Sequence, residues 1–128
     1  AEKLYNLGVK VLCQDIGFTE SHQAIIDVGE GRGQAVSRIL EEAQIITNPM
    51  PLPWDKGEEL CSGIRIGVQE ITRQGMKESE MEEVAEFMSE VISNKSPAQE
   101  VTRKVANFVS NYQQVLYRFG LEGNPTHA

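Results

Sequence analysis

Apolar and polar side chains alternate in two short runs near the start of the chain. The first run covers residues 9–13, and the second, residues 24–28, follows a turn-rich stretch at residues 15–17. A period of two is typical of strands that bury one face, so the pattern predicts two antiparallel strands. Residues 2–7 are expected to be the last turn of a helix that Gly8 ends. No start signal precedes that turn, which favours a further segment upstream.

Apolar residues recur at spacings of three and four in two longer segments, residues 35–43 and 77–93. This spacing gathers the apolar side chains on one side of a helix and the charged ones on the other. Both segments are therefore predicted to be amphipathic helices. Ser79 and Glu82 are expected to form a capping box at the start of the second.

The last predicted helix has a well-defined start. Ser96 is expected to cap it, with Pro97 at its first helical position. An apolar stripe continues as far as Phe119, and Gly120 is expected to end the helix. The tail, residues 121–128, contains Gly, Asn and Pro and is expected to be disordered.

A proline-rich segment separates the first long helix from the next strand. Residues 45–46 are expected to form a short strand, and three prolines then crowd into residues 48–60. Proline fixes φ and lacks a backbone donor, so this segment is neither a helix nor a central strand. Its length favours a functional loop. Trp54 either pins this loop or belongs to a contact surface.

The run Gly63-Ile64-Arg65-Ile66-Gly67 predicts a strand. Ile64 and Ile66 share one face, and Arg65 takes the opposite face. An arginine on a rigid strand between glycines is suited to bind a carboxylate, because its guanidinium donates two parallel hydrogen bonds. The alternative is an exposed strand arginine without a ligand.

The order of these elements predicts a single α+β domain over residues 1–128. It is expected to be a two-layer sandwich, in which helices pack on one face of a small antiparallel sheet. A chain of this length is sufficient for one hydrophobic core.

Charge and composition exclude several classes of function. The formal net charge is −7 and the basic residues are scattered, which argues against nucleic-acid binding. No apolar run is long enough to cross a membrane. Cys13 and Cys61 match no zinc spacing and accompany no secretory signal, so reduced thiols and a cytoplasmic location are expected.

Three other features suggest chemistry only weakly. Gly29, Gly31 and Gly33 lie between a strand and a helix, but their spacing is not that of a dinucleotide-binding loop, so a turn is favoured. His22 has no internal histidine partner, which favours a structural role over a metal site. The glutamates in residues 78–86 are predicted to lie on the solvated face of a helix.

Two sequence blocks carry a family resemblance. Ser62-Gly63-Ile64-Arg65-Ile66-Gly67, followed by Ile71-Thr72-Arg73-Gln74-Gly75-Met76-Lys77-Glu78, closely resembles a signature near the C-terminal end of serine hydroxymethyltransferases. Residues 19–28 and 45–53 resemble two further stretches of that family in order and spacing. The pattern of residues 67–73 is similar to that of archaeal-type members.

The resemblance implies the C-terminal small domain of a fold-type-I, pyridoxal-phosphate-dependent enzyme that moves a one-carbon unit from serine to a reduced pterin. Arg65 matches the family arginine that binds the α-carboxylate of the amino-acid substrate. The family's cofactor-binding lysine has no counterpart in this chain. The resemblance therefore implies that a missing large domain holds the cofactor, that the parent is a homodimer or larger, and that this chain alone is inactive.

The pterin site departs from the family pattern. Met50 stands where the family usually has an asparagine, so the one-carbon carrier is either tetrahydrofolate or a modified pterin. The candidate pterin contacts are Asn48, Met50, Gly57, Glu58 and Glu59. The alternative to an enzyme domain is a free-standing, non-catalytic α+β module for binding or assembly.

Overall fold

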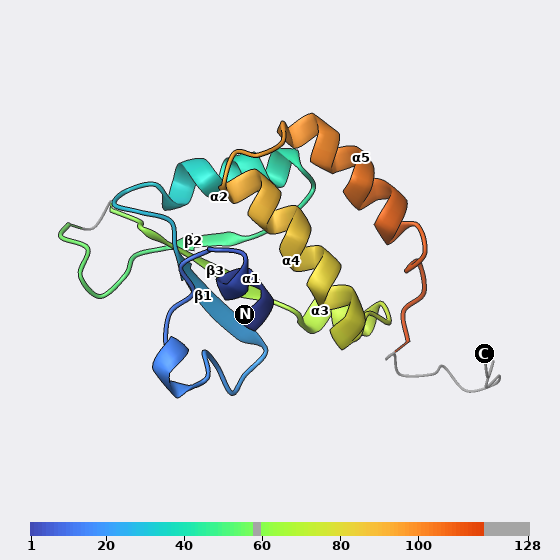
Figure 1. Ribbon diagram of the computed structural model, residues 1–128, viewed down its shortest axis with the longest axis horizontal. Coiled ribbons are helices and arrows are strands. Elements are labelled where there is room, and N and C mark those ends of the chain that lie inside the picture. Colours follow the sequence, from blue (N-terminus) through green and yellow to red (C-terminus); the bar gives the residue numbers. More distant parts are fainter. Residues whose placement is uncertain (58–59, 117–128) are drawn as a thin grey trace.

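The chain forms a small antiparallel sheet with helices packed against it (Figure 1). This computed structural model describes residues 1–57 and 60–116. The sheet has three strands in the order β1-β3-β2. The elements in chain order are α1 (Glu2–Asn6), η1 (Gln14–Ile16), β1 (Gln23–Asp27), α2 (Gly33–Glu42), β2 (Asn48–Met50), β3 (Gly63–Gly67), α3 (Gln69–Arg73), α4 (Glu78–Ile92) and α5 (Ala98–Val109).

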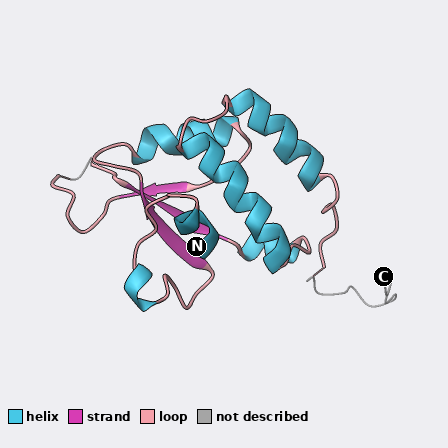
Figure 2. Cartoon of the chain, in the orientation of Figure 1, coloured by secondary structure: helices cyan, strands magenta, loops and turns pink. Residues whose placement is uncertain are grey.

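One face of the sheet meets the helices and forms the core. Ile26 of β1 and Ile64 of β3 are fully buried, as are Leu40 of α2 and Val101 of α5. Their side chains belong to one continuous apolar cluster that also includes residues of α1 and α4. Figure 2 shows these helices as a layer beside the strands, which confirms the predicted α+β, two-layer architecture.

The first predicted strand is reduced to a single bridge. Val11 pairs with Ile26 in an antiparallel bridge, and the Leu12 amide donates to the Ile25 carbonyl at 2.9 Å. The pairing cannot continue, because Cys13 adopts a left-handed conformation with φ of 63°. The prediction of a full strand over residues 9–13 was therefore wrong.

The prediction of a short strand at residues 45–46 is also wrong, because the strand lies further along the chain. Ile46 is 80% exposed, and the strand begins at Asn48, where the chain aligns with β3. Pro49 lies opposite Ile64 on this edge strand. An edge tolerates proline because one side of the strand needs no partner, so the segment avoids the central position that its prolines exclude.

Three helix boundaries differ from the predictions. Helix α5 begins at Ala98 with Pro97 as its N-cap, so the predicted cap at Ser96 and the predicted first helical position at Pro97 are each one residue too early. At the start of α4, the Glu80 carboxylate accepts a hydrogen bond from the Lys77 amide at 2.7 Å, so the capping interaction uses neither Ser79 as cap nor Glu82. The last helix ends at Val109 instead of continuing through Phe119.

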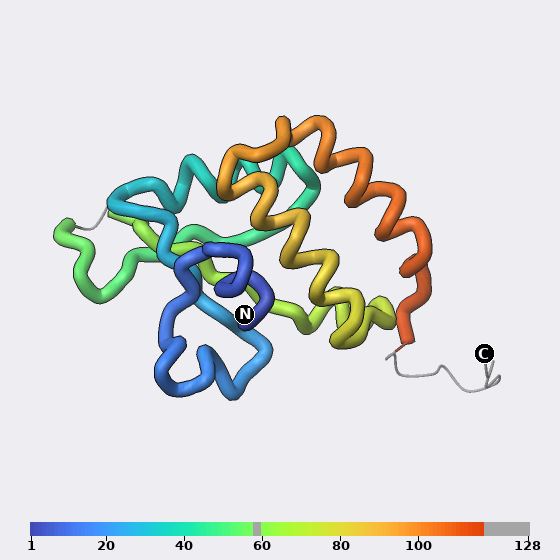
Figure 3. The backbone as a smooth tube through the Cα atoms, in the orientation of Figure 1, coloured from blue at the N-terminus to red at the C-terminus, as the bar shows by residue number. Residues whose placement is uncertain are grey.

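The chain leaves α5 because it folds back on the earlier helices. The Leu116 amide donates to the Arg73 carbonyl at 2.9 Å, and the Tyr112 ring lies 5.2 Å from that of Phe108. Figure 3 shows this return of the backbone towards α3 and the start of α4. The helix end expected at Gly120 and the disorder expected for residues 121–128 concern residues outside the described part of the chain.

Among the described residues, no helix combines the length and apolar character that crossing a bilayer requires.

Candidate functional site

Arg65 lies on the face of the sheet that the helices leave open. In the antiparallel register it stands between Ile25 of β1 and Asn48 of β2. Residues directly opposite each other share a face, so these three side chains form one row across the sheet. Arg65 is exposed, whereas Ile64 beside it is fully buried. The predicted opposition of these two residues is confirmed.

Two glycines stand on either side of Arg65 along the strand. Gly63 and Gly67, its neighbours two positions away on the same face, carry no side chain. At Gly63 a Cβ would come within 2.5 Å of Leu52 Cδ2 and 3.2 Å of the Met50 carbonyl oxygen, so glycine is required there. Leu52 therefore covers the sheet at Gly63, and the Gln69 side chain lies beside Gly67 in the same way, so a ligand reaches the exposed guanidinium from the open face and not along the strand.

The charge of Arg65 has no carboxylate partner in the described part of the chain. The ion pairs of residues 1–57 and 60–116 engage other cations. The polar neighbour of Arg65 is the neutral Asn48. With the Asn48 amide nitrogen donating to the Pro49 carbonyl at 3.2 Å, its oxygen accepts from Arg65 Nη2 at 2.7 Å. The guanidinium thus keeps its full positive charge for a ligand.

The structure separates the candidate pterin contacts. Asn48 and Met50 belong to β2 and share the open face with Arg65. Gly57 lies further along the loop, in an exposed position with φ of 108°. Glu58 and Glu59 lie outside the described residues.

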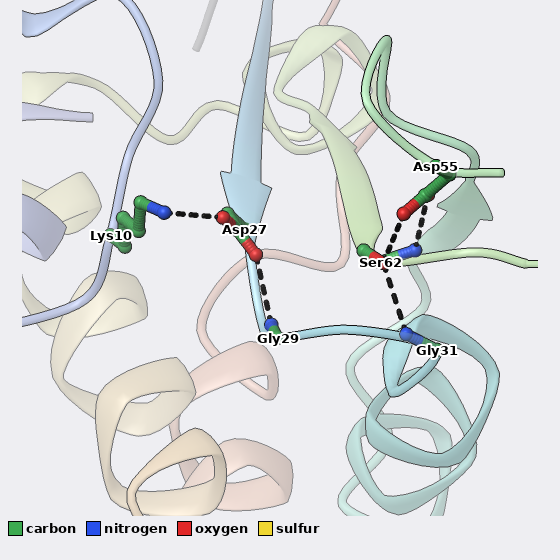
Figure 4. Close-up of polar contacts among 6 residues, drawn as sticks. All are labelled: Lys10, Asp27, Gly29, Gly31, Asp55 and Ser62. Carbon is green, nitrogen blue, oxygen red and sulfur yellow. Dashed lines mark hydrogen bonds and ion pairs between the residues drawn. The ribbon is translucent and has the colours of Figure 1, made fainter.

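A carboxylate that the sequence reading missed closes the proline-rich loop (Figure 4). Asp55 Oδ2 accepts hydrogen bonds from the Leu52 amide at 2.8 Å and the Ser62 amide at 2.9 Å. The Ser62 hydroxyl donates to Asp55 Oδ1 and accepts from the Gly31 amide at 3.0 Å. The loop is therefore tied to the start of β3 and to the turn before α2.

These hydrogen bonds explain the acidity of Asp55. The Ser62 hydroxyl, followed by the Leu52 amide, lowers the pKa of this carboxyl below its usual value because each donor stabilises the charged form. An aspartate three residues after Leu52, within a proline-rich stretch, is a recognisable turn signal. Its bond to Ser62 depends on where β3 begins, which local sequence does not reveal.

Trp54 does not pin the loop by burial. Its side chain is 55% exposed, whereas Leu52 is 3% exposed and anchors the loop in the domain. The Trp54 ring lies beneath Lys10, whose Nζ is 5.9 Å from the ring centroid. Leu52 and Asp55 therefore anchor the loop, a role for which Trp54 was one candidate.

A hollow of about 480 Å³ opens beside this loop, with Lys10, Asp27, Trp54 and Ser62 in its lining. Lys10 Nζ donates to Asp27 Oδ2 at 2.6 Å, and the Gly29 amide donates to Asp27 Oδ1 at 2.9 Å. Burial raises the pKa of Asp27, but these two hydrogen bonds outweigh burial and lower it overall. Lys10 and Asp27 are partnered with each other, and the charged lining of the hollow is completed by Glu30, Asp55 and Lys56.

The glycines before α2 form a turn, as the sequence favours. Their amides are engaged within the protein: Gly31 donates to Ser62, and Gly33 donates to the Cys61 carbonyl at 2.6 Å. A phosphate cradle needs such amides free. Residues 1–57 and 60–116 also contain no group of three side chains that could hold a metal ion.

Comparisons with known proteins agree with the arginine block. A family model described as serine hydroxymethyltransferase matches residues 1–88. The chain is 48% identical over 126 residues to serine hydroxymethyltransferase from Staphylothermus marinus, covering 96% of this chain and 29% of that protein. The enzyme from Methanothermobacter thermautotrophicus is 49% identical over 122 residues, which cover 93% of this chain and 28% of the relative.

A solved structure shares the fold. The crystal structure of L-threonine transaldolase from Pseudomonas fluorescens, in its internal aldimine state, superimposes with a TM-score of 0.79 at 29% identity. The match covers 88% of this chain and 25% of that one. With the family model matching more than half of its residues, the chain belongs to the serine hydroxymethyltransferase family and spans less than a third of the length of these relatives.

Proposed function

We propose that this chain is the C-terminal small domain of a serine hydroxymethyltransferase, and that Arg65 binds the α-carboxylate of the amino-acid substrate. The observation that carries the proposal is the exposed guanidinium on the open face of the central strand, without an acidic partner in the described residues. A fork of two donors fits a carboxylate. Held in this way, the amino acid has one orientation for reaction.

Arg65 positions the substrate, and the rest of the enzyme supplies the reactive groups. Pyridoxal phosphate, when bound, provides the electron sink for cleavage at the α-carbon of the amino acid. An amine that binds this cofactor is activated by desolvation or by a neighbouring cation. The lysines described here are either exposed or paired with carboxylates, as Lys10 is with Asp27.

The described residues therefore do not fit a pyridoxal-phosphate site. Hydrogen bonds to the carboxylates of Glu86 and Glu90 raise the pKa of Lys3 and of Lys104, respectively, which keeps both amines protonated. The amides of the glycine turn donate within the protein. We place the cofactor, and the lysine that binds it, in the large domain of the enzyme, and we expect this chain alone to be inactive.

The open face of the sheet is the proposed meeting surface with that large domain. Ile25 and Met50 lie partly buried on this face beside Arg65, so the face offers apolar area around one charge. Of the five candidate contacts of the one-carbon carrier, tetrahydrofolate or a modified pterin, Met50 and Gly57 remain proposed. Asn48 instead faces Arg65, and Glu58 and Glu59 lie outside the described residues. We further propose that the parent enzyme is a cytoplasmic homodimer.

Replacing Arg65 in the full-length enzyme tests the proposal. Arg65→Ala removes both donors from a substrate carboxylate, and we expect KM for serine to rise by about two orders of magnitude, since truncating one partner of a buried charge pair costs about 2 to 5 kcal/mol. Arg65→Lys keeps the positive charge but loses the two parallel donors. Its KM for serine is expected to lie between that of the parent enzyme and that of Arg65→Ala. Steady-state kinetics with serine, and the absorbance of the bound cofactor, provide the measurements.

Arg38→Ala is the matched control, because Arg38 is an exposed arginine on α2. This variant is expected to retain the parent KM for serine. Cofactor absorbance should be the same in all of these variants. An Arg65→Ala enzyme with the parent KM for serine would contradict the role assigned to Arg65.

A further inference from the structure

Asn48 and Arg65 are cross-strand neighbours on the open face. Both groups are satisfied in the amide orientation in which the Asn48 nitrogen donates to the Pro49 carbonyl at 3.2 Å and the Asn48 oxygen accepts from Arg65 Nη2 at 2.7 Å. The opposite orientation of the amide would place its N–H groups against those of the guanidinium, two donors face to face. Asn48 is thereby held as a hydrogen-bond acceptor for Arg65.

The surroundings of Arg65 give this contact particular weight. A free arginine side chain has about 2 kcal/mol of rotamer entropy to lose when it binds a ligand. Glycines flank Arg65 along β3, and the cross-strand neighbour on β1 is the apolar Ile25. Among the described residues, Asn48 is the side chain that accepts a hydrogen bond from the guanidinium.

We propose that Asn48 is a positioning residue, whose neutral amide oxygen holds the Arg65 guanidinium ready for the substrate carboxylate. This inference rests on the proposed role of Arg65. An amide takes one of the five N–H donors and leaves the positive charge unneutralised. A carboxylate at position 48 would instead form an ion pair with Arg65 and compete with the substrate.

Kinetics of the full-length enzyme test the role of Asn48. Asn48→Leu removes the acceptor and keeps the branched shape of the side chain, and we expect KM for serine to rise about tenfold or more, the effect of losing a hydrogen bond to a charged group. The kcat at saturating serine should change by less than about twofold. Inhibition by ethanolamine, which lacks the carboxylate, should be unchanged. Asn48→Asp should raise KM for serine at least as much as Asn48→Leu.

A double-mutant cycle shows whether Asn48 acts through Arg65. In an Arg65→Ala background, Asn48→Leu should change KM for serine no further, since the group that it positions is gone. Gln23→Leu is the matched control, because Gln23 is a polar residue on the same face, opposite Gly67. This control is expected to leave KM for serine unchanged.

Four outcomes would overturn the inference: a parent KM for serine in Asn48→Leu, full additivity with Arg65→Ala, an equal loss of ethanolamine binding, or a change confined to KM for the pterin. Each would show that Asn48 acts independently of the carboxylate. If Arg65→Ala itself leaves KM for serine unchanged, the proposed function fails, and this inference fails with it.

Discussion

At the scale of single residues, Gly33 is packed closely against backbone atoms of two other segments. This first residue of α2 lies against the end of the proline-rich loop, and its amide donates to the Cys61 carbonyl at 2.6 Å. A Cβ at this position would come within 2.6 Å of the Cys61 oxygen and 2.7 Å of the Gly63 oxygen. Both contacts are with backbone, which cannot rotate away, so the helix and the strand that carries Arg65 depend on this glycine.

Gly33→Ala is therefore expected to destabilise the chain by about 1 to 3 kcal/mol, the usual cost of overpacking. The gain of about 1 kcal/mol in helix propensity does not offset the clash. Gly67→Ala is the control, because its Cβ would meet the movable end of the Gln69 side chain. Urea unfolding of the two variants provides the comparison, and equal midpoints would contradict the expected backbone clash.

At the scale of elements, burial along α2 separates two adjacent apolar residues. Leu40 is fully buried between the sheet and the other helices, whereas Ile39 is 43% exposed. The sequence pattern assigned both to one apolar stripe. The structure turns the helix so that Val36, Ser37 and Leu40 face inward, and the Ser37 hydroxyl lies 3.1 Å from that of Thr47.

Leu40→Ala should destabilise the chain by about 2 to 5 kcal/mol, because it leaves a cavity in a closed part of the core. Ile39→Ala removes a side chain of the same size from a partly solvated position and should cost less than about 1 kcal/mol. Thermal or urea unfolding of both variants measures the difference. Similar losses would show that the rotation of α2 described above is wrong.

At the scale of the whole molecule, carboxylates connect segments that are distant in sequence. Lys10 pairs with Asp27, Lys104 with Glu90, and Asp55 bonds to Ser62. Hydrogen bonds from Lys104 and from Ser62 lower the pKa of Glu90 and of Asp55, respectively. Asp27 is also lowered, because its donors outweigh its burial.

These shifts determine the direction of the pH dependence. A carboxyl group with a lowered folded-state pKa stabilises the fold above its unfolded-state pKa, and this contribution is lost as the pH falls through the folded value. The ordinary values are 3.8 for aspartate and 4.5 for glutamate, so the free energy of unfolding should decline below about pH 4.

Asp55→Asn should make this acid decline shallower, since one of the titrating groups is removed. It should also lower stability at pH 7, where the charged acceptor is lost. Unfolding curves between pH 2 and about pH 7 for the parent and this variant provide the test. Parallel curves over the whole acid range would show that Asp55 makes no pH-dependent contribution to stability.

Local periodicity was sufficient to locate several parts of this protein before its fold was known. The alternation of residues 63–67 placed Arg65 opposite the buried Ile64, and the helical spacing of residues 77–93 located α4. Such patterns can be read locally, because burial of one face repeats with the geometry of a single element. The family resemblance of the arginine block belongs to the same level.

Contacts between distant segments, in contrast, depend on the packing of the whole domain. The start of β2 at Asn48, the end of α5 at Val109 and the bond between Asp55 and Ser62 each depend on a partner elsewhere in the chain. The contact between Asn48 and Arg65 follows from the register of two strands separated by a long loop. Local propensity contains no information about that register, because it results from packing the whole sheet against its helices.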